Sequence, residues 1–261
     1  MSTLTYALTD SATMVRRQIK HMRRYPSLTL QLVGMPVVFL LLFVYVFGGT
    51  LGNGLSTGSG GRGAYVDYVT PGILMMAVAA AATGTAISVA MDMTEGIVAR
   101  FKTMAIARVS VLTGHVIGAM VQTFVAVAVV VGVALAIGFR SDASALEWVA
   151  AAGVVGMIAF ALTWLSVAMG IAAQSVESAS NLPTPLVFLP FLGSGFVPTE
   201  SMPTGLRWFA EYQPFTPVIE TIRGLLLGTG IGSSGIVAAA WSAGIALAGY
   251  LWAKKLYNRQ A

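Results

Sequence analysis

The sequence predicts an all-α integral membrane protein with six transmembrane helices. Its 261 residues are 56% hydrophobic and only 10% charged, whereas a soluble domain carries roughly a quarter charged residues. The mean hydropathy is +0.80. A bilayer core is ~30 Å thick and needs about 20 predominantly apolar residues per helix, so this length accommodates roughly six spans and leaves little for a soluble domain.

The first 26 residues form a basic segment before the first apolar run. Val15, Ile19 and Met22 recur at i, i+4 and i+7, and five basic residues cover the remaining face. This pattern is typical of an amphipathic helix that lies in the headgroup region, and Pro26 is expected to stop it. A basic flank that only fixes the topology explains these residues equally well.

Six apolar runs follow, and each is expected to span the membrane. They cover residues 27–47, 69–91, 109–139, 148–173, 182–198 and 231–253. The fifth run is interrupted by prolines and glycines, and its ~17 residues reach only ~25 Å as a continuous helix. Backbone carbonyls that a proline leaves unbonded are tolerated at membrane depth only against protein or a water-filled cavity. The fifth span is therefore expected to face the bundle interior.

The distribution of Lys and Arg predicts the orientation. Six spans put both termini on one side, and positive residues near span ends favour the cytoplasm. A cytoplasmic N-terminus places eleven of the fifteen Lys and Arg inside and leaves four outside. Because the basic residues lie at the ends of apolar runs, they indicate a membrane boundary and no nucleic acid partner. We expect a multi-pass protein of the bacterial plasma membrane with both termini in the cytoplasm, and the lack of cysteine fits this location.

Residues 92–108 form a short charged island between the second and third spans. Asp92 is expected to cap a helix N-terminus, with Glu95 as its reciprocal partner. Ile97, Phe101 and Met104 recur at i, i+4 and i+7, which gives the helix an apolar ridge. The island is predicted to be a cytoplasmic helix whose ridge contacts a partner protein or, alternatively, folds back onto the lipid headgroups.

This island also comes close to a nucleotide-binding motif. Residues 96–103 match the P-loop spacing G-x-x-x-x-G-K-[ST] in all but one position, where Phe101 replaces the glycine that lets the backbone close round phosphate. The flanking segments are membrane spans and not a buried strand. The chain is therefore not expected to bind ATP by this motif.

Residues 199–230 are too polar to span a membrane and too apolar for an ordinary loop. Their aromatic residues suit a membrane interface. Glu220 and Arg223 stand at i and i+3 and are expected to pair. A surface ion pair is favoured over a gate, because exposed pairs contribute little.

Ion-driven transport and intramembrane catalysis are both disfavoured. The predicted spans contain no Asp, Glu, Lys or Arg, whereas ion-coupled transporters carry ionisable residues in their spans. His115 is the titratable exception apart from tyrosines, and we expect it to pack. A serine protease would need Ser194 next to His115 as its base, but the predicted topology puts these residues near opposite faces. The two histidines form no HExxH motif, so no metal site is expected.

Two blocks of the sequence resemble the ABC-2 type transporter permeases, especially the daunorubicin-resistance type of drug and lipid exporters. The first block is DMTEGIVARFKTMAIARVSVLTGHV, where Ala105 replaces a proline of the family motif. The second is FLPFLGSGFVPTESMPTGLRWFAEYQPFTPVIETIRGLLLG, which is similar to the F-V-P-x-x-x-M-P and N-P-x-T patterns of the family with Gln213 in place of asparagine. The resemblance implies a single transmembrane domain over residues 1–261.

The resemblance assigns roles that the pattern of residues alone does not. The island becomes the coupling helix, which docks on a separate ATPase subunit that binds ATP and magnesium, while this chain holds no cofactor. Two ATPase copies and a second permease, identical or not, are implied. The segments 202–212 and 217–227 become re-entrant outer helices. The implied ATPase contact is Glu95, Ile97, Arg100, Phe101 and Met104 with Arg17 and Lys20. Family members line the translocation path with spans one, two and five, so Phe39, Phe43, Phe188 and Phe191 are expected there, although core packing explains phenylalanines equally well. Glu220 and Arg223 are the candidates for an outer gate if they are more than a surface pair.

The expected function is that of the membrane subunit of an ATP-driven exporter. Its cargo would be an amphipathic drug or a lipid-like molecule, which a charge-free bundle suits. A polysaccharide or glycolipid exporter of the same family remains open, as does a stand-alone intramembrane enzyme or channel.

Overall fold

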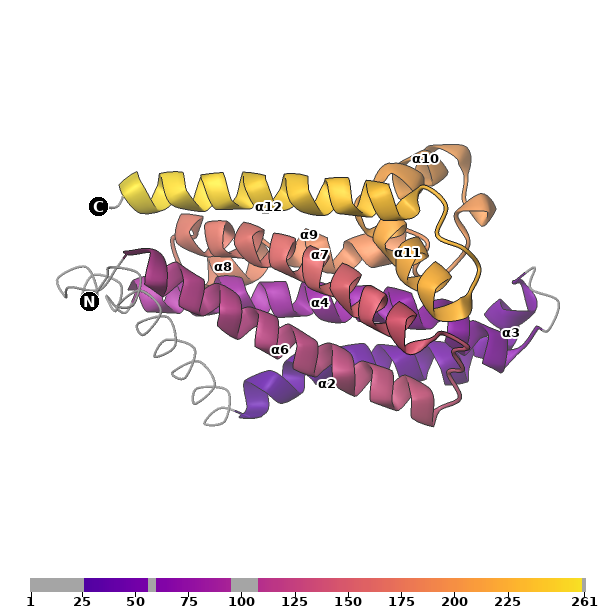
Figure 1. Cartoon of the computed structure of the whole chain (residues 1–261). Helices are drawn as coiled ribbons and strands as arrows, with labels where there is room; N and C mark the ends of the chain where they lie inside the picture. Colours follow the sequence, from indigo (N-terminus) through magenta and orange to yellow (C-terminus); the bar gives the residue numbers. More distant parts are fainter. Residues whose placement is uncertain (1–25, 56–59, 95–107, 260–261) are drawn as a thin grey trace.

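The computed structural model describes residues 26–55, 60–94 and 108–259, and this part of the chain contains helices and no strands. Five helical stretches are long and apolar enough to cross a membrane: Leu32–Asn53, Arg62–Thr94, His115–Ala136, Ala145–Ala172 and Ser234–Arg259. They lie lengthwise beside one another (Figure 1). The prediction of an all-helical membrane protein is thus confirmed for the described residues.

The long helices begin and end close to the apolar runs. The first stretch consists of α2 (Pro26–Leu42), a π-helical turn η1 (Phe43–Phe47) and α3 (Gly48–Asn53). The others are α4 (Arg62–Thr94), α6 (Arg108–Ala136), α7 (Ala145–Ala172) and α12 (Ser234–Arg259). α7 begins with a capping box, in which Ser144 Oγ accepts from the Glu147 amide and Glu147 Oε2 accepts from the Ser144 amide at 2.6 Å. This cap explains why α7 begins before the predicted residue 148.

α4 is the central helix of the bundle. It packs against α2, α6, α7 and α11, and most of its residues are buried. α7 packs in turn on α12, where a Cβ added at Gly249 would lie 2.6 Å from the Leu165 backbone nitrogen. The glycine lets these two backbones approach closely, as small residues do between membrane helices.

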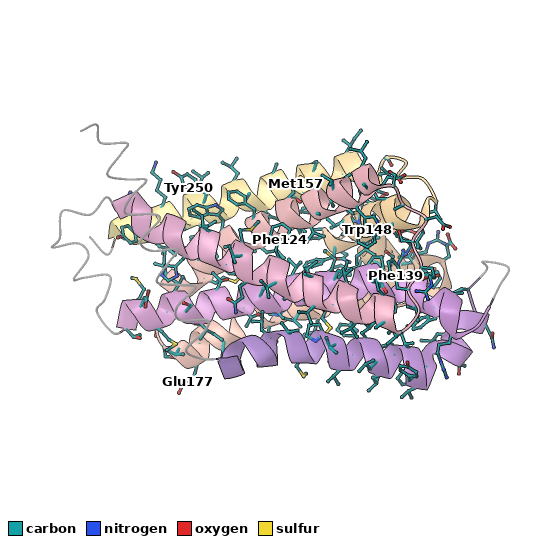
Figure 2. All side chains as sticks on the ribbon, turned by 60° about the horizontal axis from the view of Figure 1, so that its bottom comes forward. Phe124, Phe139, Trp148, Met157, Glu177 and Tyr250 are labelled. Atoms are coloured by element: carbon teal, nitrogen blue, oxygen red, sulfur yellow. The ribbon has the colours of Figure 1, made fainter. Side chains whose placement is uncertain are left out.

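Two small helices, α10 (Thr204–Tyr212) and α11 (Phe215–Leu227), lie together at one end of the bundle (Figure 1). We call this the α11 end. Phe139 and Trp148 lie at the same end (Figure 2), with ring centroids 6.5 Å apart and planes at 90°. At the opposite end α4 finishes, α6 begins and α12 finishes (Figure 1).

The predicted fifth span is not a continuous helix. Residues 182–198 contain α9 (Thr184–Phe188) and the 3-10 turn η2 (Leu189–Leu192), followed by the irregular residues 193–198, and the short helix α8 (Val176–Asn181) precedes them. These pieces lead the chain from the end where α7 finishes to the α11 end (Figure 1). Pro183, Pro185 and Pro190 lack the amide hydrogens that a long helix needs, which accounts for the interruption.

Asp92 lies inside α4 and not at the start of a separate helix, so the prediction that it is an N-cap is wrong. α4 continues to Thr94, and the Asp92 carboxylate contacts His115 of α6. Residues 1–25, 56–59, 95–107 and 260–261 are outside the described part. The predicted amphipathic N-terminal helix and the island residues from Glu95 onward fall there.

Candidate functional site

Arg223 is the centre of a polar cluster at the α11 end. Its side chain, on α11, is only 8% exposed. Nη1 donates to Glu220 Oε1 at 2.6 Å, and Nη2 donates to the backbone carbonyls of Ser194 at 2.7 Å and Tyr68 at 3.1 Å. The guanidinium carbon also lies 3.9 Å from the centroid of the Tyr68 ring, within cation–π range. Arg223 therefore joins α11, α4 and the irregular segment 193–198.

Two tyrosines of α4 hold the same irregular segment. Tyr68 Oη donates to the Ser194 carbonyl at 3.0 Å, and Tyr65 Oη donates to the Phe196 carbonyl at 3.2 Å. Residues 193–196 are all buried. These carbonyls have no helical partner and receive side-chain donors instead, as a membrane interior requires. The expectation that the fifth span faces the bundle interior therefore holds for residues 193–196, whereas α9 of the same span contains no buried residue.

Gln213, just after α10, binds the segment from its other side. Its Nε2 donates to the Leu189 carbonyl at 3.3 Å and to Thr216 Oγ1 at 3.0 Å. Its Oε1 accepts from the amide of Phe215, the first residue of α11, at 3.1 Å. Thr216 Oγ1 in turn accepts from the Ser194 amide at 3.4 Å. The glutamine that departs from the family pattern thus supports both α11 and the broken segment.

Glycine allows α4 to touch the irregular segment. A Cβ added at Gly72 would lie 2.4 Å from the Gly195 carbonyl oxygen. A side chain at this position would push the segment away from Tyr65 and Tyr68, so the cluster depends on this close approach.

The predicted Glu220–Arg223 pair is confirmed, but its interpretation as a surface pair is wrong. Glu220 is 39% exposed, whereas the Arg223 side chain is buried. Sequence spacing found the pair because both residues are on one helix turn. It did not reveal that α4 and the segment 193–198 cover the guanidinium.

Three of the four residues expected in the translocation path lie together. Phe39, on α2, has its ring centroid 5.6 Å from that of Phe191, and Phe43 lies 6.2 Å from Phe191. Phe196 stacks on Phe191 at 4.3 Å with planes only 4° apart. Phe188, the fourth, is on α9 and is 57% exposed. The sequence reading missed Phe196.

Phe47 extends this aromatic cluster along the first long helix. Its ring centroid is 5.6 Å from that of Phe43, and both residues lie in the π-helical turn η1. The i, i+4 spacing of Phe39, Phe43 and Phe47 could have revealed the third ring. Single π-helical turns are frequent at functional sites.

α10 presents an exposed aromatic pair. Trp208 and Tyr212 are 66% and 64% exposed, and their ring centroids are 5.4 Å apart. Arg207 Nε donates to Glu211 Oε1 at 2.7 Å on this helix, and this hydrogen bond raises the pKa of the guanidinium. Such amphipathic aromatic rings suit the headgroup level of a membrane.

Ser194 and His115 are far apart, so a protease built on them is excluded. Ser194 contacts Tyr68, whereas His115 contacts Asp92. These two residues of α4 are separated by ~36 Å at 1.5 Å per residue. Within the described ranges no group of three His, Cys, Asp or Glu could hold a metal ion.

The fold and the cluster define a helical multi-pass membrane protein with an irregular segment bound inside its bundle. The family model for ABC-2 type transporters matches residues 10–227. The chain belongs to this family, as the two sequence blocks indicated.

Two curated relatives are similar to this chain over most of its length. One is the daunorubicin resistance ABC transporter permease protein DrrB1 of Streptomyces coeruleorubidus, 27% identical over 242 residues that cover 92% of this chain and 80% of the relative. The other is the "Probable doxorubicin resistance ABC transporter permease protein DrrC" of Mycobacterium tuberculosis, 27% identical over 212 residues that cover 80% of this chain and 75% of the relative. This chain is similar to permease subunits of drug-resistance ABC transporters.

Proposed function

We propose that this chain is the membrane permease of an ATP-driven exporter in the bacterial plasma membrane. Its cargo is an amphipathic drug with a planar aromatic part, or a lipid-like molecule. The observation that carries the proposal is the ABC-2 type match over residues 10–227 together with relatives named for daunorubicin and doxorubicin resistance.

The proposed topology has six crossings and both termini in the cytoplasm. Five crossings are the long apolar helices, and the segment 176–198 makes the other by α8, α9 and η2. Its direction, from the end of α7 toward the α11 end, supports this assignment (Figure 1). The α11 end then faces outward, with α10 and α11 as re-entrant helices. The excess of Lys and Arg on the opposite side supports the same orientation.

A separate subunit binds and hydrolyses the ATP. Residues 95–107 are proposed as the coupling segment, between α4 and α6, with contacts to a groove on the ATPase. A helix that presents an apolar ridge to a groove is a common docking mode. The contact residues are those implied by the family resemblance: Glu95, Ile97, Arg100, Phe101 and Met104, assisted by Arg17 and Lys20. Two ATPase copies hold the ATP and magnesium, and this chain performs no hydrolysis.

The cargo is proposed to pass between this chain and a second permease. Phe39, Phe43 and Phe191 form an apolar aromatic strip in this path, which suits a planar aromatic cargo. Phe188 lies exposed on α9, where it is accessible to a second permease or to the cargo. Glu220 and Arg223 form the outer gate, since the half-exposed carboxylate holds a guanidinium that also binds the broken span.

Co-purification and vesicle transport test the proposal together. The chain carrying a C-terminal tag is extracted from its host in mild detergent, and a P-loop ATPase is expected in near-stoichiometric amount. Inverted membrane vesicles that contain the complex should accumulate doxorubicin only when ATP is supplied. If no ATPase is recovered even after crosslinking, the exporter assignment is overturned. An ATPase without doxorubicin uptake would redirect the cargo assignment to a glycolipid, which the same vesicles can assay.

A further inference from the structure

A buried ion pair joins α4 to α6 at the end of the bundle opposite α11. His115 Nε2 and Asp92 Oδ2 are 3.1 Å apart, and both residues are 8% exposed. The other ion pairs of the described residues, on α10 and α11, each connect two residues of one helix. Asp92 and His115 thus make the ion pair that connects two separate helices in that part of the chain.

The pair stands at the base of the proposed coupling segment. Asp92 is two residues before the end of α4 at Thr94, and His115 is seven residues after the beginning of α6 at Arg108. Residues 95–107 connect these two helix ends. The Asp92–His115 pair therefore links α4 and α6 close to the points from which the connecting segment extends.

On one side of the pair, α4 belongs to a tightly packed block. A Cβ at Gly170 of α7 would lie 2.6 Å from the Ala86 carbonyl oxygen of α4, so these backbones are in direct contact. Val89 of α4 shares an apolar cluster with residues of α7 and α12, and Val116 of α6 joins it. Apolar contacts of this kind are non-directional, whereas a hydrogen bond between two side chains has a preferred distance and angle.

Stability alone does not explain an ion pair at this position. The cost of taking the carboxylate and the imidazole out of water commonly offsets their attraction, and well-packed apolar residues of similar volume often hold helices at least as well. A fixed register between two helices is a property that apolar residues supply less well. A fixed register matters at this location because residues 95–107, the proposed coupling segment, extend from these two helix ends.

We infer that Asp92 and His115 are positioning residues for the transmission of ATPase movement. The ion pair makes α4 and α6 move together when residues 95–107 are displaced, so that the displacement reaches the whole bundle. Without it, the helix ends separate and ATP is hydrolysed with little export. This inference rests on the proposed function, in which residues 95–107 contact the ATPase.

The test is the number of doxorubicin molecules transported per ATP hydrolysed by the reconstituted permease–ATPase complex. His115→Ala is expected to lower this ratio roughly fivefold to tenfold, at the low end of the ~5–150-fold range of couplings between two sites, while the ATPase co-purifies in unchanged amount. Thr123→Val is the matched control, because Thr123 is buried on the same helix and its hydroxyl bonds only to the Ala119 carbonyl among the contacts described. It should leave the ratio unchanged.

A variant in which the two residues are exchanged distinguishes a positioning role from a general packing role. Asp92→His with His115→Asp restores an ion pair and should recover most of the ratio, whereas Asp92→Ala with His115→Ala should not. If His115→Ala or the double alanine variant transports with the ratio of the original chain, the inference is overturned although the exporter assignment stands. Equal losses in the reversed and double alanine variants would also overturn it. If no ATPase co-purifies with the original chain, the proposed function is overturned, and this inference is overturned with it.

Discussion

Tyr68 and Arg223, 155 positions apart in the sequence, bind the same carbonyl oxygen. Tyr68 Oη and Arg223 Nη2 lie 3.0 and 2.7 Å from the oxygen of Ser194, and the guanidinium rests over the tyrosine ring. This arrangement ties an interrupted membrane segment to two helices without any regular backbone hydrogen bonding. The stability of the α11 end should therefore depend on these side chains.

Arg223→Ala should destabilise the folded chain by ~2–3 kcal/mol, because charge-assisted hydrogen bonds to buried carbonyls contribute about that much. Arg207→Ala is the matched control on α10, where the pair with Glu211 is exposed and contributes little to stability. Thermal unfolding in detergent, followed by tryptophan fluorescence, compares the two. Equal unfolding temperatures for the two variants would contradict the assigned role of Arg223.

Gly72→Ala should disrupt the contact between α4 and the segment 193–198. The new Cβ would lie 2.4 Å from the Gly195 carbonyl oxygen, a distance that neither backbone can accept without moving. Gly63→Ala, in the same helix, meets no atom within 4 Å and should be neutral or stabilise by ~0.5–1 kcal/mol. The amount of monodisperse protein after extraction measures both effects. If Gly72→Ala yields as much monodisperse protein as the original chain, the contact between Gly72 and Gly195 is less close than described.

Phe43→Ala should reduce ATP-dependent doxorubicin uptake roughly fivefold, which corresponds to about 1 kcal/mol of ring contact with the cargo. Phe160→Ala is the control, because Phe160 is 43% exposed on α7 and lies outside the aromatic strip. Uptake is normalised to the permease present in the vesicles. Similar uptake by both variants would contradict the assignment of Phe39, Phe43 and Phe191 to the translocation path.

Phe101→Asp should separate ATP hydrolysis from transport. A charged carboxylate in an apolar helix ridge opposes docking in an apolar groove, so the ATPase should no longer co-purify while the permease stays in the membrane. Lys102→Asp, a neighbouring change of sign that spares the ridge, is the control and should retain the ATPase. Retention of the ATPase by the Phe101→Asp variant at normal membrane amounts would exclude this residue from the contact.

The sequence predicted the helices well because apolar runs of spanning length have few alternatives in a membrane. It placed the end of the second span at Met91, since an isolated aspartate is costly in such a helix. The partner that offsets this cost, His115, lies on a different helix and leaves no signal in the local pattern.

The cluster around Arg223 was only partly predictable for the same reason. The i, i+3 spacing on α11 revealed the bond to Glu220, whereas the contacts that bury the guanidinium come from α4 and residue 194. Phe39, Phe43 and Phe191 were chosen as aromatic residues of neighbouring spans, and they do meet. Phe188 is exposed and lies at the end of α9, where the interrupted segment changes from an α-helix to the 3-10 turn η2, a change that a continuous helical pattern does not predict.

α4 contributes Tyr68 to the cluster at one end of the bundle and Asp92 to the ion pair at the other. α4 is a continuous helix from Arg62 to Thr94, so one element carries both polar contacts. A spectroscopic probe beside Tyr68 would therefore test whether a change at Asp92 is felt at the other end of the same helix.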